Sequence, residues 1–234
     1  MLAQRTRKGA GGTMTNRLPV WMLRDLSLPR LRRYIRAAHG DAQAAERLYW
    51  WNVEVSAALF GSLHCLELAL RNALHNALAR YHGRPDWWAV APLNERGHKL
   101  VDDARRSCGR RLRRITPDDV VAELSFGFWV SLLSHGSGYD RHFWVPVLHS
   151  AFPYYRGRRD RLYRELSSLV LLRNRVMHHE PVHHRHLSAD HDTICRVLGY
   201  LSPELAKESQ MMDRFPEVLA SRADVLGGAR PPRF

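Results

Sequence analysis

The chain has 234 residues, 45% of them apolar, so it is long enough and apolar enough to bury a core. Its 36 Lys and Arg against 23 Asp and Glu give a net charge of +13, which favours polyanionic partners, although an Arg-rich proteome gives the same excess. The scattered Cys65, Cys108 and Cys195 exclude a disulfide framework and fit a cytoplasmic protein in which Cys65 and Cys195 are reduced core thiols.

The two ends of the chain differ in composition from the middle. The start is basic and lacks the apolar run of a signal peptide, so we expect a disordered basic arm over residues 1–17. Residues 227–234 indicate a flexible tail, and no membrane segment is apparent. We therefore expect a single helical domain over residues 18–226.

Helical periodicity dominates this domain. Apolar residues recur at three- and four-residue steps, and no stretch alternates as a strand does, so the sequence predicts an all-α fold. Helices are expected at about 28–39, 41–81, 94–114, 117–132, 139–151, 158–179, 188–200 and 203–212.

Start and stop signals set most helix ends. Ser27 is the expected cap of the first helix, and Gly40 follows its end. The long second helix contains one glycine, Gly61, where a bend is possible. Thr116 and the proline and acids after it form a strong start signal, and Pro146 predicts a kink in the helix around it.

One late helix ends in a cluster of polar groups. Arg173, Asn174 and His178 follow an apolar stretch, and Pro181 stops the helix behind them. Asn174 and His178 are four residues apart and share a face, and Arg173 lies about 140° round the helix from His178. We expect the long Arg173 side chain to reach the same rim of the helix. Pairs of Arg and His at such spacings also occur by chance in this chain. The pair of Arg173 and His178 differs from them because it lies at the end of an apolar helix.

These residue types suit RNA cleavage without a metal. Attack by a 2′-OH on its own phosphate needs a proton acceptor and a donor for the leaving oxygen, and an imidazole serves as either. An arginine offers a bidentate cation for the charge that develops on the phosphorane. The hypothesis calls for no cofactor and no metal ligand.

A second polar row interrupts the long apolar helix. Glu67, Arg71 and His75 follow one another at four-residue steps among leucines and alanines. A solvent-facing stripe of salt bridges is the plain interpretation. The apolar surroundings favour a largely buried helix, in which a charged row tends to be paired and functional.

Several segments together resemble a known family. They are Leu26-Ser27-Leu28-Pro29-Arg30-Leu31, Tyr49-Trp50-Trp51-Asn52, Leu66-Glu67-Leu68-Ala69-Leu70-Arg71-Asn72, Leu124-Ser125-Phe126-Gly127-Phe128-Trp129 and Leu172-Arg173-Asn174-Arg175-Val176-Met177-His178-His179-Glu180. In this order, over roughly residues 26–201, they resemble the Abi-like (abortive infection, AbiD/AbiF-type) proteins of the HEPN superfamily.

The resemblance implies a HEPN-like helical bundle with additional N- and C-terminal helices. It implies an endoribonuclease toxin of phage defence that acts as a homodimer, with RNA as substrate and an antitoxin or defence protein as a possible partner. Arg173, His178 and Asn174 match its catalytic motif. The residues that match its supporting positions are Glu67, Arg71, Asn72 and His179.

Basic runs supply candidate contacts to tRNA or mRNA. The candidates are Arg110, Arg111, Arg113, Arg114, Arg158 and Arg159. Exposed charge runs are more often solvated faces. A non-catalytic RNA- or partner-binding module therefore remains the alternative to the enzyme.

The histidine-rich segment after the motif contains a zinc-protease sequence pattern that we do not expect to bind zinc. His179 to His183 spells H-E-x-x-H, but Pro181 between them ends the helix that zinc-protease chemistry requires. A wider set could bind metal adventitiously, although a surface loop is favoured. That set is His178, His179, His183, His184, His186 and His191.

Overall fold

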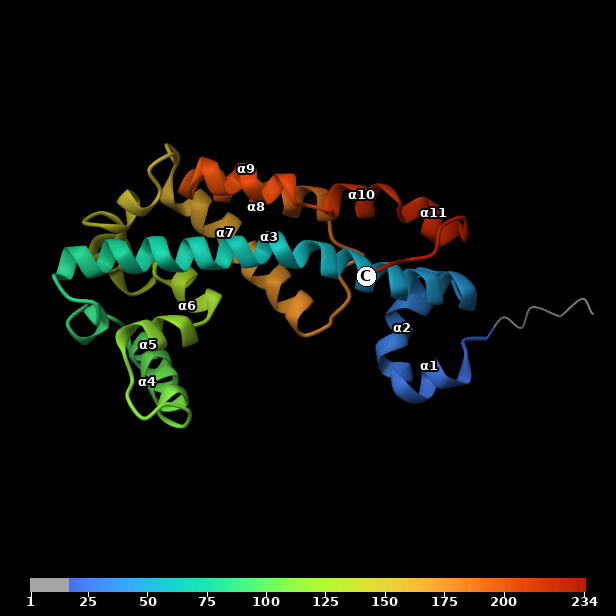
Figure 1. The fold of residues 1–234 in the computed structure, drawn as a ribbon, viewed down its shortest axis with the longest axis horizontal. Helices are drawn as coiled ribbons and strands as arrows, with labels where there is room; N and C mark the ends of the chain where they lie inside the picture. The colour runs from blue at the N-terminus through green and yellow to red at the C-terminus, as the bar shows by residue number, and fades with distance from the viewer. Residues whose placement is uncertain (1–16) are drawn as a thin grey trace, which may run out of the picture. The chain divides into compact units, whose positions relative to one another are not determined.

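A computed structural model describes residues 17–234, and the rest of the predicted basic arm lies outside the described residues. The fold is all-α, as predicted, and no strand occurs in residues 17–234 (Figure 1). The described residues form two compact units, 17–51 with 222–233 and 52–221. The extent of the single domain expected over residues 18–226 stays a prediction.

The first unit contains three short helices and the start of a long one. They are α1 (Val20–Asp25), α2 (Leu28–Ala37), α11 (Arg222–Gly227) and the first turns of α3 (Ala42–His82). Helix α1 was not expected. Ser27 precedes α2 as predicted, but its side chain makes no capping hydrogen bond and its φ is +66°. Here the guanidinium of Arg222 lies 5.0 Å from the centre of the Trp51 ring.

The second unit contains the rest of α3 and seven further α-helices. They are α4 (Glu95–Gly109), α5 (Pro117–Glu123), α6 (Phe126–Ser131), α7 (Arg159–Met177), α8 (Leu187–Leu201), α9 (Pro203–Met211) and α10 (Phe215–Ala220). Four single turns lie between them: η1 (Trp87–Ala89), η2 (Gly136–Gly138), η3 (Asp140–Trp144) and η4 (Leu148–Ala151). Helix α7 packs against α6 and α8, and α8 packs against α9 and α10.

Helix α3 carries the predicted apolar stripe and continues without interruption through Gly61. The stripe is buried along its length: Leu59, Leu63, Leu66, Leu70, Leu74 and Leu78. By length and composition α3 is the one described helix that could cross a membrane, with 39% of its most apolar stretch buried. The core helix of a soluble protein has the same properties, so α3 is weak evidence for a membrane span.

Two helices begin with side-chain caps, and the cap at Thr116 was predicted. The Asn94 side chain accepts a hydrogen bond from the backbone N–H of Gly97 at 2.8 Å, which begins α4. Thr116 and Asp119 form a reciprocal capping box at the start of α5. These side chains satisfy backbone donors that a helix leaves unpaired in its first turn.

Two predicted helices differ in the structure. The helix expected over residues 117–132 is two helices, because Leu124 adopts an extended conformation and the Ser125 hydroxyl caps the start of α6 by accepting a hydrogen bond from the backbone N–H of Phe128. The helix expected over residues 139–151 is absent, and η3 and η4 replace it. Pro146 lies between them, where its missing N–H and its ring are incompatible with a continuous helix.

Helix α7 ends as the sequence predicts. His178 is its C-terminal cap, and His179 adopts a left-handed conformation with φ of +56° before Pro181. Beyond Pro181, the buried Asn52 side chain on α3 accepts hydrogen bonds from the backbone N–H groups of Val182 and His183, at 2.7 and 3.1 Å. These bonds hold the connection after α7 against α3.

Candidate active site

Arg173 and Glu67 form the central contact of the site. Arg173 Nε donates to Glu67 Oε2 at 2.9 Å and Nη2 donates to Oε1 at 3.2 Å. Their side chains are 27% and 21% exposed, so the pair is partly shielded from water. A two-bond pair of this kind fixes the plane of the guanidinium as well as its position. Glu67 therefore holds Arg173 in one orientation.

A pocket of about 520 Å³ lies beside this pair. Arg173 and Asn174 form part of its wall from α7, and Arg96 lies in the wall from α4. Hydroxyl groups supply other polar atoms of the lining: Ser125, Ser131, Ser134, Tyr139, Tyr163 and Ser167. A pocket of this size falls within the range that holds small molecules or a single nucleotide.

His178 lies apart from Arg173. It is exposed at the end of α7, it does not line the pocket, and within residues 17–234 its side chain has no hydrogen-bond or ion-pair partner. Leu171, Asn174 and His178 share one face of α7, since steps of three and four residues return to the same side. All three are exposed, and Leu171 is 60% exposed although it is apolar. One chain therefore does not bring Arg173 and His178 together.

The other two residues of the polar row on α3, Arg71 and His75, contact different segments of the second unit. Arg71 does not pair with Glu67 in the described chain, and its Nη1 approaches the Ala122 carbonyl oxygen at 3.5 Å. His75 Nδ1 accepts a hydrogen bond from the buried Trp87 indole at 3.2 Å. Burial lowers the pKa of His75, a half-buried imidazole that contacts the core through Trp87. The row of Glu67, Arg71 and His75 therefore does not form a solvent-facing stripe of salt bridges.

The remaining supporting positions lie on the surface. Asn72 and His179 are both exposed, and neither lines the pocket. The segment H-E-x-x-H is not helical, because α7 ends at Met177 and His183 lies in the connection held by Asn52. The two histidines therefore do not share a helix face, as predicted.

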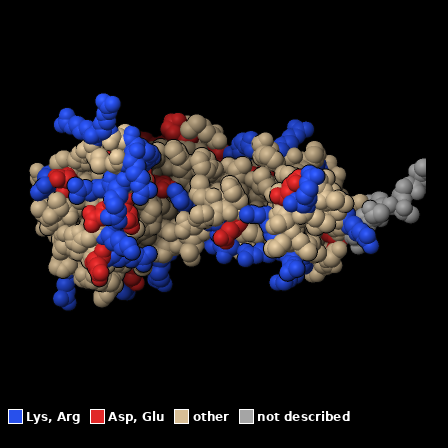
Figure 2. Space-filling model, turned by 90° about the horizontal axis from the view of Figure 1, so that it is seen from below, with Lys and Arg blue, Asp and Glu red and all other residues tan. Residues whose placement is uncertain are grey.

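The candidate RNA-binding arginines divide into two groups. Arg110, Arg113 and Arg114 are exposed where α4 ends, and Arg110 lines a second pocket of about 330 Å³. The other three are engaged within the unit: Arg111 with Glu123, Arg158 with Asp160, and Arg159 with the Leu133 carbonyl oxygen. Figure 2 views the side on which α4 and α5 lie, and shows basic atoms there with acidic atoms among them.

A further polar cluster was not predicted as a unit. His191 is on α8 with Cys195 one turn later, and Asp213 precedes α10. Burial by itself lowers the pKa of His191, but its contacts with Cys195 and Asp213 raise that pKa to about 9. Cys195 is half-buried beside this pair, whereas the most buried thiol is Cys108. The step of four between His191 and Cys195 was the available sequence signal.

The chain matches no protein-family model, no curated protein and no solved structure.

Proposed function

We propose that the protein is a metal-independent endoribonuclease of the Abi-like, HEPN type, which cleaves RNA by attack of a 2′-OH on the adjacent phosphate. The observation that carries the proposal is the Arg173 guanidinium, held by Glu67 at the wall of a pocket large enough for a nucleotide. A cation fixed before the substrate arrives costs no reorganisation when charge develops on the phosphate.

The guanidinium retains donors for a phosphate. Glu67 engages Nε and Nη2, and Nη1 has no partner among residues 17–234. In the proposed mechanism Nη1 donates to a phosphate oxygen, and the Asn174 amide orients the phosphate or the imidazole. Glu67 offsets part of the Arg173 charge, so Arg96 in the same pocket wall supplies the additional positive charge that a phosphate requires.

His178 moves the proton in this mechanism, and a second copy of the chain brings it to the site. Arg173 faces α3, whereas His178 lies on the exposed face of α7 with Leu171 and Asn174. Asn174 lies both on this face and in the wall of the Arg173 pocket, so a twofold axis beside Asn174 would bring the His178 of each chain to the pocket of the other and would cover the exposed Leu171. The proposal therefore includes a homodimer.

The wider charge of the chain supports a polyanionic substrate. The exposed Arg110, Arg113 and Arg114 at the end of α4 can bind phosphates without sequence preference. We propose tRNA or mRNA as the substrate, a cytoplasmic location, and a role as a toxin in abortive infection with an antitoxin or defence protein as partner. The alternative function is a helical module that binds RNA or a partner without cleavage.

The test is incubation of the purified protein with total tRNA and with mRNA, without added divalent cations, followed by mapping of the cut ends. The proposed chemistry yields a 2′,3′-cyclic phosphate and a 5′-hydroxyl. His178→Ala should abolish cleavage and leave RNA binding unchanged in a filter or gel-shift assay. His98→Ala, which removes another exposed histidine outside the pocket, is the matched control and should cleave as the wild type does.

Two outcomes separate the alternatives. Persistent cleavage by the His178→Ala protein would show that the proposed proton-transfer residue is wrong. RNA binding by the wild type without cleavage of any tested RNA would favour the binding module.

A further inference from the structure

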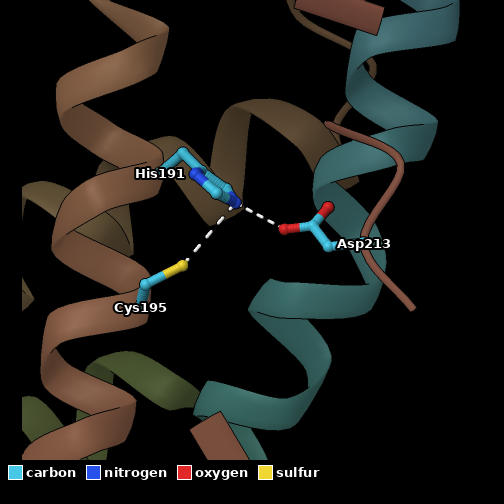
Figure 3. A group of neighbouring side chains, drawn as sticks. All are labelled: His191, Cys195 and Asp213. Carbon is cyan, nitrogen blue, oxygen red and sulfur yellow. Dashed lines mark hydrogen bonds and ion pairs between the residues drawn. The ribbon is translucent and has the colours of Figure 1, made fainter. Parts of the chain in front are cut away.

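Three potential metal ligands converge in the second unit, apart from the Arg173 pocket. His191 and Cys195 lie one turn apart on α8, and Asp213 reaches them from the segment between α9 and α10 (Figure 3). His191 Nε2 lies 2.5 Å from Asp213 Oδ2 and 3.6 Å from Cys195 Sγ. All three ligand atoms lie within 4.8 Å of one another. We propose that these side chains bind a zinc ion.

The spacing of the ligand atoms is close to that of a tetrahedral zinc site. With zinc bonds of about 2.0–2.1 Å to nitrogen and about 2.3 Å to sulfur, the two ligand atoms lie about 3.6 Å apart, as His191 and Cys195 do. A nitrogen and an oxygen ligand lie about 3.3 Å apart, so the Asp213 carboxylate moves away from His191 by about 0.8 Å when the ion enters. The ion then replaces the hydrogen bond between them.

The chemistry of the three ligands selects the class of ion. A thiolate, an imidazole and one carboxylate suit zinc, whereas magnesium and calcium prefer oxygen ligands alone. The charges also cancel, because a divalent ion with a thiolate, a carboxylate and a neutral imidazole forms a neutral group. Neutrality matters here, since the His191 and Asp213 side chains are only 12% and 4% exposed. Binding releases the thiol proton and the proton between His191 and Asp213.

Neighbouring groups hold the ligands in place. The backbone N–H of Phe215 donates to Asp213 Oδ1 at 2.8 Å, and the Ser62 hydroxyl donates to Oδ2 at 3.3 Å. The Phe215 ring stacks on the His191 imidazole, with 4.5 Å between ring centres. Contacts of this kind orient the side chains that bind a metal directly, and they raise the affinity for the metal.

A pocket of about 310 Å³ adjoins the proposed site at Asp213, and Ser62 and Cys65 are also part of its wall. A water molecule from this pocket completes the tetrahedron, so three protein ligands suffice. The ion would then connect α8 to the segment between α9 and α10.

The same three residue types also occur in nucleophilic triads, but this geometry does not fit one. In a triad the thiol and the acid contact different ring nitrogens, so that the acid orients the imidazole while the other nitrogen takes the proton. Here Cys195 and Asp213 both contact Nε2 of His191. The three ligand atoms are therefore gathered at one place, as an ion bound to all three requires.

The experiment uses the full chain, purified without a histidine tag. Metal content is measured by inductively coupled plasma mass spectrometry, and Co²⁺ is then bound to the chelator-stripped protein. We expect ~1 zinc per chain and a cobalt spectrum with a thiolate charge-transfer band. Cys195→Ser should lose the band and lower the affinity for Co²⁺ by more than ~100-fold, and Ser62→Ala should lower it by about tenfold.

Cys65→Ser is the matched control, since it removes the other thiol near the site. It should retain the metal and the cobalt band. Far-ultraviolet circular dichroism checks that each variant is folded, and Asp213→Asn provides a second ligand variant of nearly the same shape.

Protein that holds no zinc and gives no thiolate band with Co²⁺ would overturn the proposal and leave a buried ion pair with a neighbouring thiol. Metal binding that survives in folded Cys195→Ser and Asp213→Asn proteins would also overturn it, because other residues would then be the ligands.

Discussion

Glu67→Ala removes the carboxylate that orients Arg173 and leaves the guanidinium without its partner in a partly shielded position. A hydrogen bond to a charged group contributes about 1.5–3 kcal/mol when it is buried. Both side chains retain about a quarter of their exposure, so solvent screening reduces the contribution of the two bonds together. We therefore expect a loss of about 2 kcal/mol in the free energy of unfolding, which corresponds to a fall in Tm of about 4–8 °C.

Urea unfolding followed by circular dichroism measures this loss. A double-mutant cycle with Arg173→Ala isolates the contact itself, and we expect a coupling energy of about 1–2 kcal/mol. The Arg175–Glu180 pair at the end of the same helix is the control, because it is longer, at 3.4 Å, and more exposed. Its cycle should give a clearly smaller coupling. A coupling between Glu67 and Arg173 below about 0.3 kcal/mol would refute the argument that Glu67 fixes the guanidinium.

Three further predictions follow from other contacts. Leu171→Glu should turn the proposed dimer into a monomer in sedimentation analysis while circular dichroism stays unchanged, and an unaltered dimer would contradict a twofold axis on this face of α7. Thr116→Ala should lower the free energy of unfolding by about 1 kcal/mol, because it removes one half of the capping box on α5. Burial lowers the pKa of His75, so the unfolded chain binds a proton below about pH 6.5 that the folded chain does not. Stability at neutral pH should therefore be lost as the pH falls through this range, and His75→Gln should reduce the slope; an identical slope in urea titrations would show that His75 is not the group responsible.

Two helix ends with strong local signals were predictable from the sequence. Thr116 and Pro181 each act within a few residues of themselves, so local chemistry was enough to mark the helix boundary near each of them. The break at Leu124 was missed because the apolar spacing of Val120, Leu124 and Phe128 continues across it. Periodicity reports which residues are buried and does not report whether the backbone between them is continuous.

Contacts between distant segments were predictable only in part. The sequence indicated that Glu67 is paired, since a charged residue within an apolar helix needs a partner, and the structure shows that this partner is Arg173. The sequence did not indicate that His178 stays outside the Arg173 pocket, although the 140° separation round the helix was the available sign. Asp213 lies far along the chain from His191, and no local pattern connects residues at that separation.

The Asn52 contact has a consequence for insertions and deletions. Asn52 binds the backbone of Val182 and His183, and a few residues later Arg185 forms a two-bond pair with Asp190 on α8. The number of residues between α7 and α8 is therefore fixed at both ends. Adding or deleting a single residue in this connection would separate one of these anchors from its partner. Related chains should therefore keep this connection constant in length.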